Sequence, residues 1–392
     1  MREWPSAIPP TKFKAKNLNE TKSTETIKPL TLPVQSGKIF GTDKYTVTFR
    51  LGSPYQELSL PFNTISNLIW TRCNPDIPAV RQDLYFKPSA SSTYFNITCN
   101  SPLCINFVPQ LKYCTSNTSM CIYSSKYDDQ SFSDGIFSLD RLNMTDEFSD
   151  FLFFCVPYDP RRFSVSPNAG LLGLGRGDLS LASQLGLIYN NYFSYCLPSN
   201  SNSTGHLTFG INNSANNNNN NVKFTRLFAS KNYPSFYFIR IVSIAVGGGD
   251  LSIDYQSPVF QDPGIKIDSG TFITRLPAEA YAPMRDAFRE QMKDSPMAPT
   301  HDIFDTCYYN TTNQPIKVTI PVVSFTFDGD VRVEFDASAI FHAVDPTVMC
   351  FSFANNTRPP SLSVFGNAQQ KKMEVVYDVA NEKLGFRPNG CD

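Results

Sequence analysis

The feature that most constrains this chain is an approximate internal repeat of a strand, a short polar turn and an apolar tripeptide ending in glycine. In the first half, FNTIS at 62–66 precedes LLG at 171–173 by about a hundred residues. In the second half, IDSGT at 267–271 precedes VFG at 364–366 at a similar separation. Two copies of one β unit that face each other would bring the two turns together across a cleft.

The remaining sequence is typical of short strands. Runs such as YTVTFRLG, ELSLPF and NLIW are separated by Gly, Pro and Asn. Helical character is limited to DLSLASQLG and to residues 277–294, where a proline precedes apolar residues at helical spacing. The chain has 392 residues, 41% of them hydrophobic, which is enough to divide a core between two domains. We therefore predict a mainly β protein with two domains.

Composition suggests where these domains begin and end. Residues 1–36 are polar and lack apolar periodicity, so they are predicted to be a disordered leader or the remnant of a propeptide. An Asn-rich run at 212–221 cannot join a packed core and is predicted to be a loop near the boundary. Folded sequence is expected to begin near Lys38. The predicted lobes then span 37–211 and 222–392.

Cysteine usage indicates an oxidising compartment. The ten cysteines show no paired CxxC pattern, which favours a disulfide framework over metal knuckles. Glycosylation motifs of the form Asn-x-Ser/Thr favour the same route, although chance occurrence in an Asn-rich chain is the alternative. The first residues contain no apolar segment of the length that a signal peptide needs. We expect a glycoprotein that is secreted to the extracellular space or vacuolar, in preference to a plastid protein. The motifs begin at Asn19, Asn96, Asn117, Asn143, Asn202, Asn212, Asn310 and Asn355.

Several classes of function find no support. The net charge is −1 with dispersed Lys and Arg, and no apolar run is long enough to span a bilayer, so neither nucleic acid nor a membrane is an expected partner. His206, His301 and His342 lie far apart and in no ligand spacing, so no metal is expected. The glycine-rich pieces are incomplete phosphate fingerprints, and no G-x-S-x-G element is present. We expect a monomer without a cofactor.

From about Leu32 to Asp392 the chain resembles the plant pepsin-like aspartic peptidases of the nepenthesin-like branch. The resemblance implies a bilobal pepsin-like fold, with two related β-barrel-like lobes around a central cleft that holds a polypeptide substrate or ligand. The matching segments, in order along the chain, are LPVQSGKIFGTDKYTVTFRLGSP, LIWTRC, GLLGLGRGDLSLASQL, FSYCLPS, VSIAVGG, IKIDSGTFITRLP and FGNAQQKKMEVVYDVANEKLGFRPNGCD.

The chemistry of that family uses two turns that read Asp-Thr/Ser-Gly-Thr/Ser. Their aspartates lie a few ångströms apart and share one proton, because both cannot be ionised at that distance. One carboxylate acts as a base on water while the other acts as an acid. The resemblance makes Asp268 the intact catalytic residue of the second turn, which continues with Ser269, Gly270 and Thr271.

The first turn departs from the family pattern. Asn63 stands where the aspartate of this first turn is expected, and a neutral amide can neither take nor give the shared proton. Ile65 stands where the glycine is expected, a position that favours small size and open backbone geometry. Asn67 also replaces the usual acidic residue, whereas Thr64 is retained.

We therefore expect a member of the aspartic endopeptidase family whose peptide-binding cleft is retained while proteolysis is lost or severely impaired. One alternative is an active aspartic endopeptidase that works at acid pH. The other is a binding protein similar to the plant xylanase inhibitors.

The family also has a hairpin that closes over the substrate. The region at 121–137 is similar to it, and Tyr127 is the candidate for its tyrosine. Trp70, just beyond the first turn, matches the tryptophan that would bond to this tyrosine. Ordinary packing of both aromatic residues is the alternative. The expected substrate-binding residues are Tyr127, Trp70, Gly270, Thr271, Ser269 and Thr64.

The resemblance also implies a set of disulfides that the sequence alone cannot establish. Two of them would close short loops and three would form longer ties. The implied pairs are Cys99–Cys104, Cys114–Cys121, Cys73–Cys155, Cys196–Cys391 and Cys307–Cys350.

Overall fold

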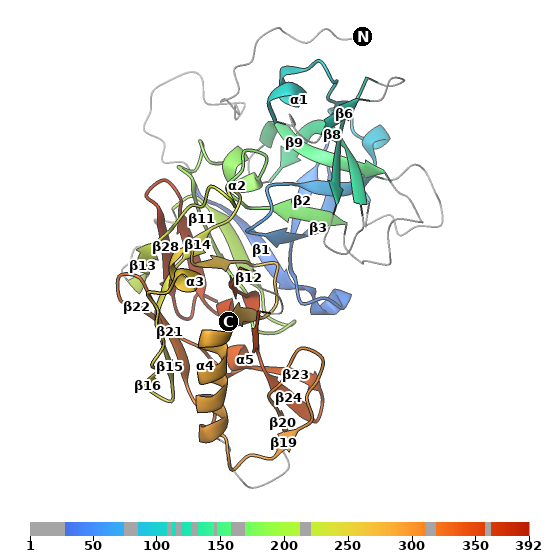
Figure 1. Ribbon diagram of the computed structural model, residues 1–392. Helices are drawn as coiled ribbons and strands as arrows, with labels where there is room; N and C mark the ends of the chain where they lie inside the picture. Colours follow the sequence, from blue (N-terminus) through green and yellow to red (C-terminus); the bar gives the residue numbers. More distant parts are fainter. Residues whose placement is uncertain are drawn as a thin grey trace.

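The computed structural model of the protein is mainly β, as predicted (Figure 1). The helices are α1 (Pro102–Phe107), α2 (Leu181–Gln184), α3 (Pro258–Gln261), α4 (Ala278–Gln291) and α5 (Ala337–Ile340), with 3-10 turns η1 (Gly37–Phe40), η3 (Pro88–Ala90) and η6 (Asn367–Gln370). The structure describes residues 28–73, 85–107, 112–114, 119–126, 132–144, 147–157, 169–211, 221–310, 319–356 and 362–391.

The strands fall into two sets, one in each half of the chain. The first half contains β1 (Leu30–Ser36), β2 (Tyr45–Leu51), β3 (Gln56–Asn63), β4 (Trp70–Cys73), β5 (Phe95–Asn96), β6 (Lys112–Cys114), β7 (Cys121–Lys126), β8 (Phe132–Asn143), β9 (Glu147–Pro157), β10 (Gly170–Gly173), β11 (Tyr192–Cys196) and β12 (Gly205–Phe209).

The second half contains β13 (Lys223–Arg226), β14 (Phe238–Ile239), β15 (Ile241–Val246), β16 (Gly249–Asp250), β17 (Ile265–Ile267), β18 (Thr274–Leu276), β19 (Met297–Ala298), β20 (Cys307–Tyr309), β21 (Val323–Phe327), β22 (Val331–Glu334), β23 (Phe341–Asp345), β24 (Val348–Phe351), β25 (Phe353–Asn355), β26 (Val364–Phe365), β27 (Glu374–Asp378) and β28 (Lys383–Arg387).

One continuous sheet joins the two halves. Its order begins β13-β28-β27-β11-β12-β1-β2-β3-β10 and continues into the first-half strands β4, β9, β8, β7 and β6. We call the part from β13 to β1 the interlobe sheet. Within it, β11 pairs antiparallel with β27, so strands from opposite halves of the sequence are direct neighbours. Figure 1 shows β28 and β13 on the same side of the molecule as β11.

Strand β1 begins at Leu30, inside the predicted leader, whereas folded sequence was expected to begin near Lys38. Strand β1 alternates buried and exposed residues, as a strand with one buried face should. Pro33 lies inside this strand, where a proline cannot donate a hydrogen bond to a neighbouring strand. It is accommodated because pairing with β2 begins only at Val34, so its missing N–H breaks no bond on that side. Residues 1–27 of the predicted leader and residues 212–220 of the Asn-rich run lie outside the described residues.

The internal repeat has the same structural basis in both halves. Strand β10 lies parallel to β3, with Leu172 opposite Phe62. Strand β26 lies parallel to β17, with Phe365 opposite Ile267. Each turn therefore starts where its strand is supported by the apolar tripeptide, and the predicted repeat is confirmed.

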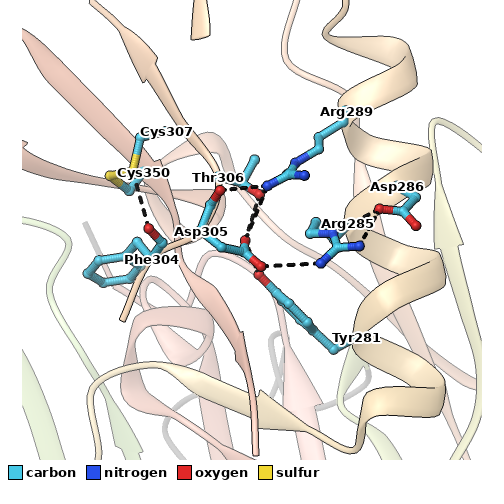
Figure 2. A network of polar contacts seen from close by, with 9 residues as sticks. All are labelled: Tyr281, Arg285, Asp286, Arg289, Phe304, Asp305, Thr306, Cys307 and Cys350. Atoms are coloured by element: carbon cyan, nitrogen blue, oxygen red, sulfur yellow. Dashed lines mark hydrogen bonds and ion pairs between the residues drawn. A yellow bond between two sulfur atoms is a disulfide. The ribbon is translucent and has the colours of Figure 1, made fainter. Parts of the chain in front are cut away.

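Helix α4 confirms the long helix predicted at 277–294, and a polar cluster fastens it to the segment before β20 (Figure 2). The Tyr281 hydroxyl donates to Asp305 Oδ1 at 2.5 Å. Arg285 Nη1 lies 3.4 Å from Asp305 Oδ2, and Arg289 Nη2 donates to the Asp305 carbonyl oxygen. The Tyr281 side chain is itself buried in the main hydrophobic core, so it joins this polar cluster to that core. The helix is thus held by both apolar and charged contacts.

Three of the implied disulfides are confirmed: Cys73–Cys155, Cys196–Cys391 and Cys307–Cys350. The two implied short-loop pairs, Cys99–Cys104 and Cys114–Cys121, are wrong, because Cys104 pairs with Cys121. Helix α1 buries Cys104 in the same small apolar cluster as Cys121, so neither is left for its neighbour in sequence. Cys99 is also disulfide-bonded.

Within the described part of the chain, no helix is long and apolar enough to cross a membrane. No group of three or more His, Cys, Asp or Glu residues that could hold a metal ion occurs in those same ranges.

Candidate active site

The two repeated turns meet through reciprocal hydrogen bonds between Thr64 and Ser269. The Thr64 N–H donates to Ser269 Oγ at 3.2 Å, and the Ser269 N–H donates to Thr64 Oγ1 at 3.1 Å. Each hydroxyl then donates to the strand of the other half, to the carbonyl oxygens of Ile267 and Phe62. Both side chains are fully buried. The structure thus uses these two residues, which we expected at the substrate, to hold the turns together.

Asp268 is held by its own turn. Its Oδ1 accepts hydrogen bonds from the N–H groups of Gly270 at 2.8 Å and Thr271 at 3.2 Å. Its Oδ2 accepts one from the Thr271 hydroxyl at 2.5 Å. The carboxylate is 0% exposed, so these three donors replace the water that would otherwise solvate it. Asp268 is therefore fixed in position, as a reacting group must be.

Asn63 occupies the matching position at the end of β3. Its Oδ1 accepts a hydrogen bond from the Ile65 N–H at 2.7 Å, just as Asp268 Oδ1 does from Gly270. A Cβ atom added to Gly270 would lie 2.3 Å from Asn63 Nδ2 and 3.2 Å from Asp268 Oδ1. The amide and the carboxylate therefore face each other across Gly270, which must be a glycine because any side chain would meet Asn63.

Ile65 is the counterpart of Gly270 in the first turn. Neither residue has a positive φ, so the backbone of both turns is accessible to any residue. The expected conflict with open backbone geometry is therefore absent. What distinguishes the two turns is space, since Ile65 brings a half-buried, β-branched side chain to the edge of the site where the second turn has none.

A buried network behind the turns was not anticipated from the sequence. The Tyr195 hydroxyl donates to Gln370 Oε1 at 2.5 Å, and Gln370 Nε2 donates to the Asp268 carbonyl oxygen at 3.4 Å. Tyr195 also lies 3.4 Å, oxygen to oxygen, from Tyr377, which bonds to the Thr64 hydroxyl. Burial raises the pKa of both tyrosines far above the usual range, so both hydroxyls stay protonated. The network connects the two turns through the interlobe sheet.

The signals for this network were present but ambiguous. Tyr195 belongs to FSYCLPS and Gln370 to FGNAQQ, both of which carried the family resemblance. Their alternation within or beside strands is equally typical of simple core packing. The tertiary structure, in which the Tyr195 hydroxyl reaches Gln370 Oε1, shows that their polar ends meet.

Asn67 connects the first turn to segments on both sides of the site. Its Oδ1 accepts a hydrogen bond from the Gly177 N–H at 2.8 Å, and its Nδ2 donates to Ser235 Oγ at 2.5 Å. An amide can do both, whereas a carboxylate only accepts. A Cβ at Gly177 would lie 2.4 Å from the Asn67 amide, so the two residues fit closely together.

The hairpin prediction is tested only at one of its two residues. Tyr127 lies outside the described residues. Trp70 begins β4, where it is half-buried and packs against the apolar cluster that contains Phe137 and Phe154. Their hydrogen bond remains a prediction.

Comparisons with known proteins agree with this architecture. The family model described as xylanase inhibitor N-terminal matches residues 45–211, and the one described as xylanase inhibitor C-terminal matches residues 236–388. An aspartyl protease family protein of Arabidopsis thaliana is 40% identical over 389 residues, which cover 97% of this chain and 78% of the relative. Aspartic proteinase nepenthesin-2 of Nepenthes gracilis is 30% identical over 355 residues, 90% of this chain and 78% of the relative.

The crystal structure of conglutin gamma, a basic 7S globulin from lupine seeds, superposes with a TM-score of 0.75 at 21% identity, covering 93% of this chain and 96% of that one. At this identity the likeness concerns the fold alone, and it confirms the bilobal, mainly β architecture. The sequence relatives cover nearly the whole chain, and the two turns that carry Asn63 and Asp268 lie together, as the two aspartate-bearing turns of this family do. This chain therefore belongs to the plant pepsin-like aspartic protease family.

Proposed function

We propose that this family member binds a polypeptide between its two turns and hydrolyses it very slowly or not at all. The observation that carries the proposal is the Asn63 amide, which lies beside Asp268 at the position where the reaction needs a second carboxyl group. With Asp268 ionised, no acid is available for the peptide carbonyl. With Asp268 protonated, no base is available for the attacking water.

The expected loss is large. Proton transfer by a positioned group accelerates such reactions by about 10²–10⁴-fold, and replacing one member of the pair removes the acid or the base. Ile65 adds a side chain beside the same site. We therefore expect turnover at least about 10³-fold below that of a restored pair.

Peptide binding does not depend on the missing proton. Asn63 is only half-buried and retains an amide that can donate to a peptide carbonyl beside the buried Asp268. The bonds between Thr64 and Ser269 keep both groups in place. The proposed partner is thus a polypeptide bound by a monomer. We further propose an extracellular or vacuolar location, which the disulfides and the glycosylation motifs support.

The test is cleavage of a denatured protein at acid pH by the purified chain, with and without pepstatin, beside the double variant Asn63→Asp/Ile65→Gly. We expect no turnover by the unmodified chain and pepstatin-sensitive turnover by the double variant. Asp268→Ala in the double variant serves as the control and should abolish the gain. Pepstatin-sensitive turnover by the unmodified chain that Asp268→Ala removes would refute the proposal in favour of an active peptidase.

A further inference from the structure

Basic side chains gather around Phe272, the residue that follows the second turn. The His342 ring lies 4.6 Å from the Phe272 ring between centroids, and Lys371 Nζ lies 5.8 Å from the Phe272 centroid. The carbonyl oxygens of Thr271 and Phe272 accept hydrogen bonds from the start of η6, and Lys371 follows the last residue of η6. The two basic groups are therefore held on one aromatic side chain, directly beside the turn of Asp268.

The positive charge of Lys371 has no matching ion pair. Its Nζ donates to the Ser338 carbonyl oxygen at 3.3 Å, and it forms no ion pair with a carboxylate in the part of the chain that the structure describes. Two carboxylates act on it from further away, Asp43 and Asp336. Asp336 is already engaged, because it accepts from the Ser338 N–H and lies 3.9 Å from Lys372.

More basic than acidic side chains act on Lys371 and His342. Burial, followed by the charge of Lys38, lowers the pKa of Lys371 to about 8. Burial also lowers the pKa of His342, with the charges of Lys38, Lys371 and His301 acting in the same direction and that of Asp43 opposing them. Lys371 and His342 are half-buried and Lys38 is exposed, so the group is open to a ligand from solvent.

We propose that Lys371, His342 and Lys38 bind a carboxylate of the peptide ligand, so that the protein prefers peptides with an acidic residue beside the turn of Asp268. This inference rests on the peptide binding proposed above and specifies the ligand. A carboxylate would contact Lys371 directly, whereas Asp43 and Asp336 act on it from further away, and it would occupy the N–H groups of Lys371 that the protein does not use. A cationic or purely apolar group at this position would leave Lys371 with no carboxylate in direct contact.

The proposal has a definite pH dependence. A bound carboxylate raises the pKa of both basic groups, because it stabilises their charged forms. As pH rises, His342 loses its charge first and Lys371 loses it near pH 8, so affinity falls with rising pH. It is highest at a pH above the pKa of the ligand carboxyl, about 4.3 for glutamate, and below the lowered pKa of His342. The charged and titratable groups that act on Lys371 and His342 are Lys38, Asp43, His301 and Asp336.

The chain contains three histidines, so NMR of 13C-labelled histidine gives a direct readout, with the His342 signal assigned by His342→Gln. The probes are acetylated, amidated hexapeptides with one glutamate placed at each position in turn, beside the same series with glutamine. A glutamine peptide with a free terminal carboxylate distinguishes terminal from side-chain recognition. At pH 5.5 we expect one glutamate peptide to bind about tenfold more tightly than its glutamine partner and to raise the pKa of His342.

The variants decide whether Lys371 is responsible. Lys371→Met should remove the preference for glutamate, and Lys371→Arg should retain it. Lys372→Met is the matched control, because it removes the same charge from the next residue, which contacts Asp336, and should change the preference less than about twofold. Equal binding of both series, or a preference that survives Lys371→Met, would overturn the inference while leaving peptide binding intact. Failure of every peptide to bind would overturn both proposals.

Discussion

The two turns of the site, one carrying Asn63 and the other Asp268, have nearly the same structure but differ in their chemistry. In each, a side-chain oxygen accepts a hydrogen bond from the N–H two residues later, at 2.7 Å for Asn63 and 2.8 Å for Asp268. Any residue with an acceptor at that position satisfies this structural requirement, and an amide does so as well as a carboxylate. The reaction requires an ionisable oxygen, which only Asp268 has. The hydrogen bond that shapes the turn and the proton transfer that catalysis needs are therefore separate requirements. Asn63 meets the structural requirement but not the catalytic one.

The largest effect is expected on the rate of peptide hydrolysis when Asn63→Asp and Ile65→Gly are made one at a time. Asn63→Asp alone restores the proton-sharing pair but leaves Ile65 beside it, whereas Ile65→Gly alone clears space without restoring a carboxyl group. We expect Ile65→Gly to remain inactive, and Asn63→Asp to gain activity that stays about 10-fold or more below the double variant. Initial rates on a denatured protein at acid pH measure this. Equal activity of Asn63→Asp and the double variant would mean that Ile65 does not obstruct the site.

The next largest effect is expected on the free energy of unfolding, when the hydrogen bonds between Thr64 and Ser269 are removed. Thr64→Val keeps the shape of the side chain but leaves the Ser269 N–H and the Ile267 carbonyl without their partner, both of them buried. We expect it to lower the free energy of unfolding by about 2–3 kcal/mol, with Thr64→Ser as the control that keeps the hydroxyl. Urea unfolding measures both. Combining Thr64→Val with Ser269→Ala should cost less than the sum of the two, because they disrupt one set of bonds.

The network behind the turns tests whether the second turn depends on the first lobe. Tyr195→Phe leaves Gln370 Oε1 without its donor, so we expect a loss of about 1–2 kcal/mol of unfolding free energy. In the catalytically restored double variant it should also lower kcat more than it changes KM, because Gln370 supports Asp268. Tyr192→Phe, on the same strand, is the matched control. A loss of the same size in Tyr192→Phe would show that the effect is packing on β11 and not the hydrogen bond.

The smallest expected effect concerns the interlobe sheet. Glu374 Oε2 lies 2.8 Å from His206 Nε2 and 3.4 Å from Arg387 Nη2, so these contacts join strands from both halves. Burial alone would raise the pKa of Glu374, but His206 and Arg387 lower it below its ordinary value. Because the folded pKa is depressed, the stabilisation is complete well above about pH 4.3 and is lost as pH falls below it.

Glu374→Gln should remove that part of the acid dependence and cost about 1 kcal/mol near pH 6. Urea unfolding between pH 3 and pH 6 provides the comparison, and Glu334→Gln in β22, where the side chain is largely exposed, is the control. Parallel pH profiles for the unmodified chain and Glu374→Gln would show that Glu374 does not join the halves electrostatically.

The parts of the fold that follow local patterns were predictable from the sequence. The repeat placed the two turns together, and apolar spacing after Pro277 predicted α4. Strand β1 was missed because its short alternation at Leu30, Leu32 and Val34 follows a long polar segment and was assigned to the leader with it. The Cys104–Cys121 bond was missed because helix α1 buries Cys104 in the apolar cluster that contains Cys121, and the spacing of cysteines along the chain does not reveal this. The role of Gln370 depends on contacts between segments that are far apart in sequence.

The interlobe sheet also determines the order in which this protein can be completed. Strand β11 borders β27, and Cys196 is bonded to Cys391, which follows it by 195 residues. During synthesis the first half therefore emerges with an unpaired strand edge and an unpaired thiol, and it must wait for most of the second half to be translated. Contacts so distant in sequence form slowly. The first lobe is consequently completed only by strand β27 and Cys391 of the second.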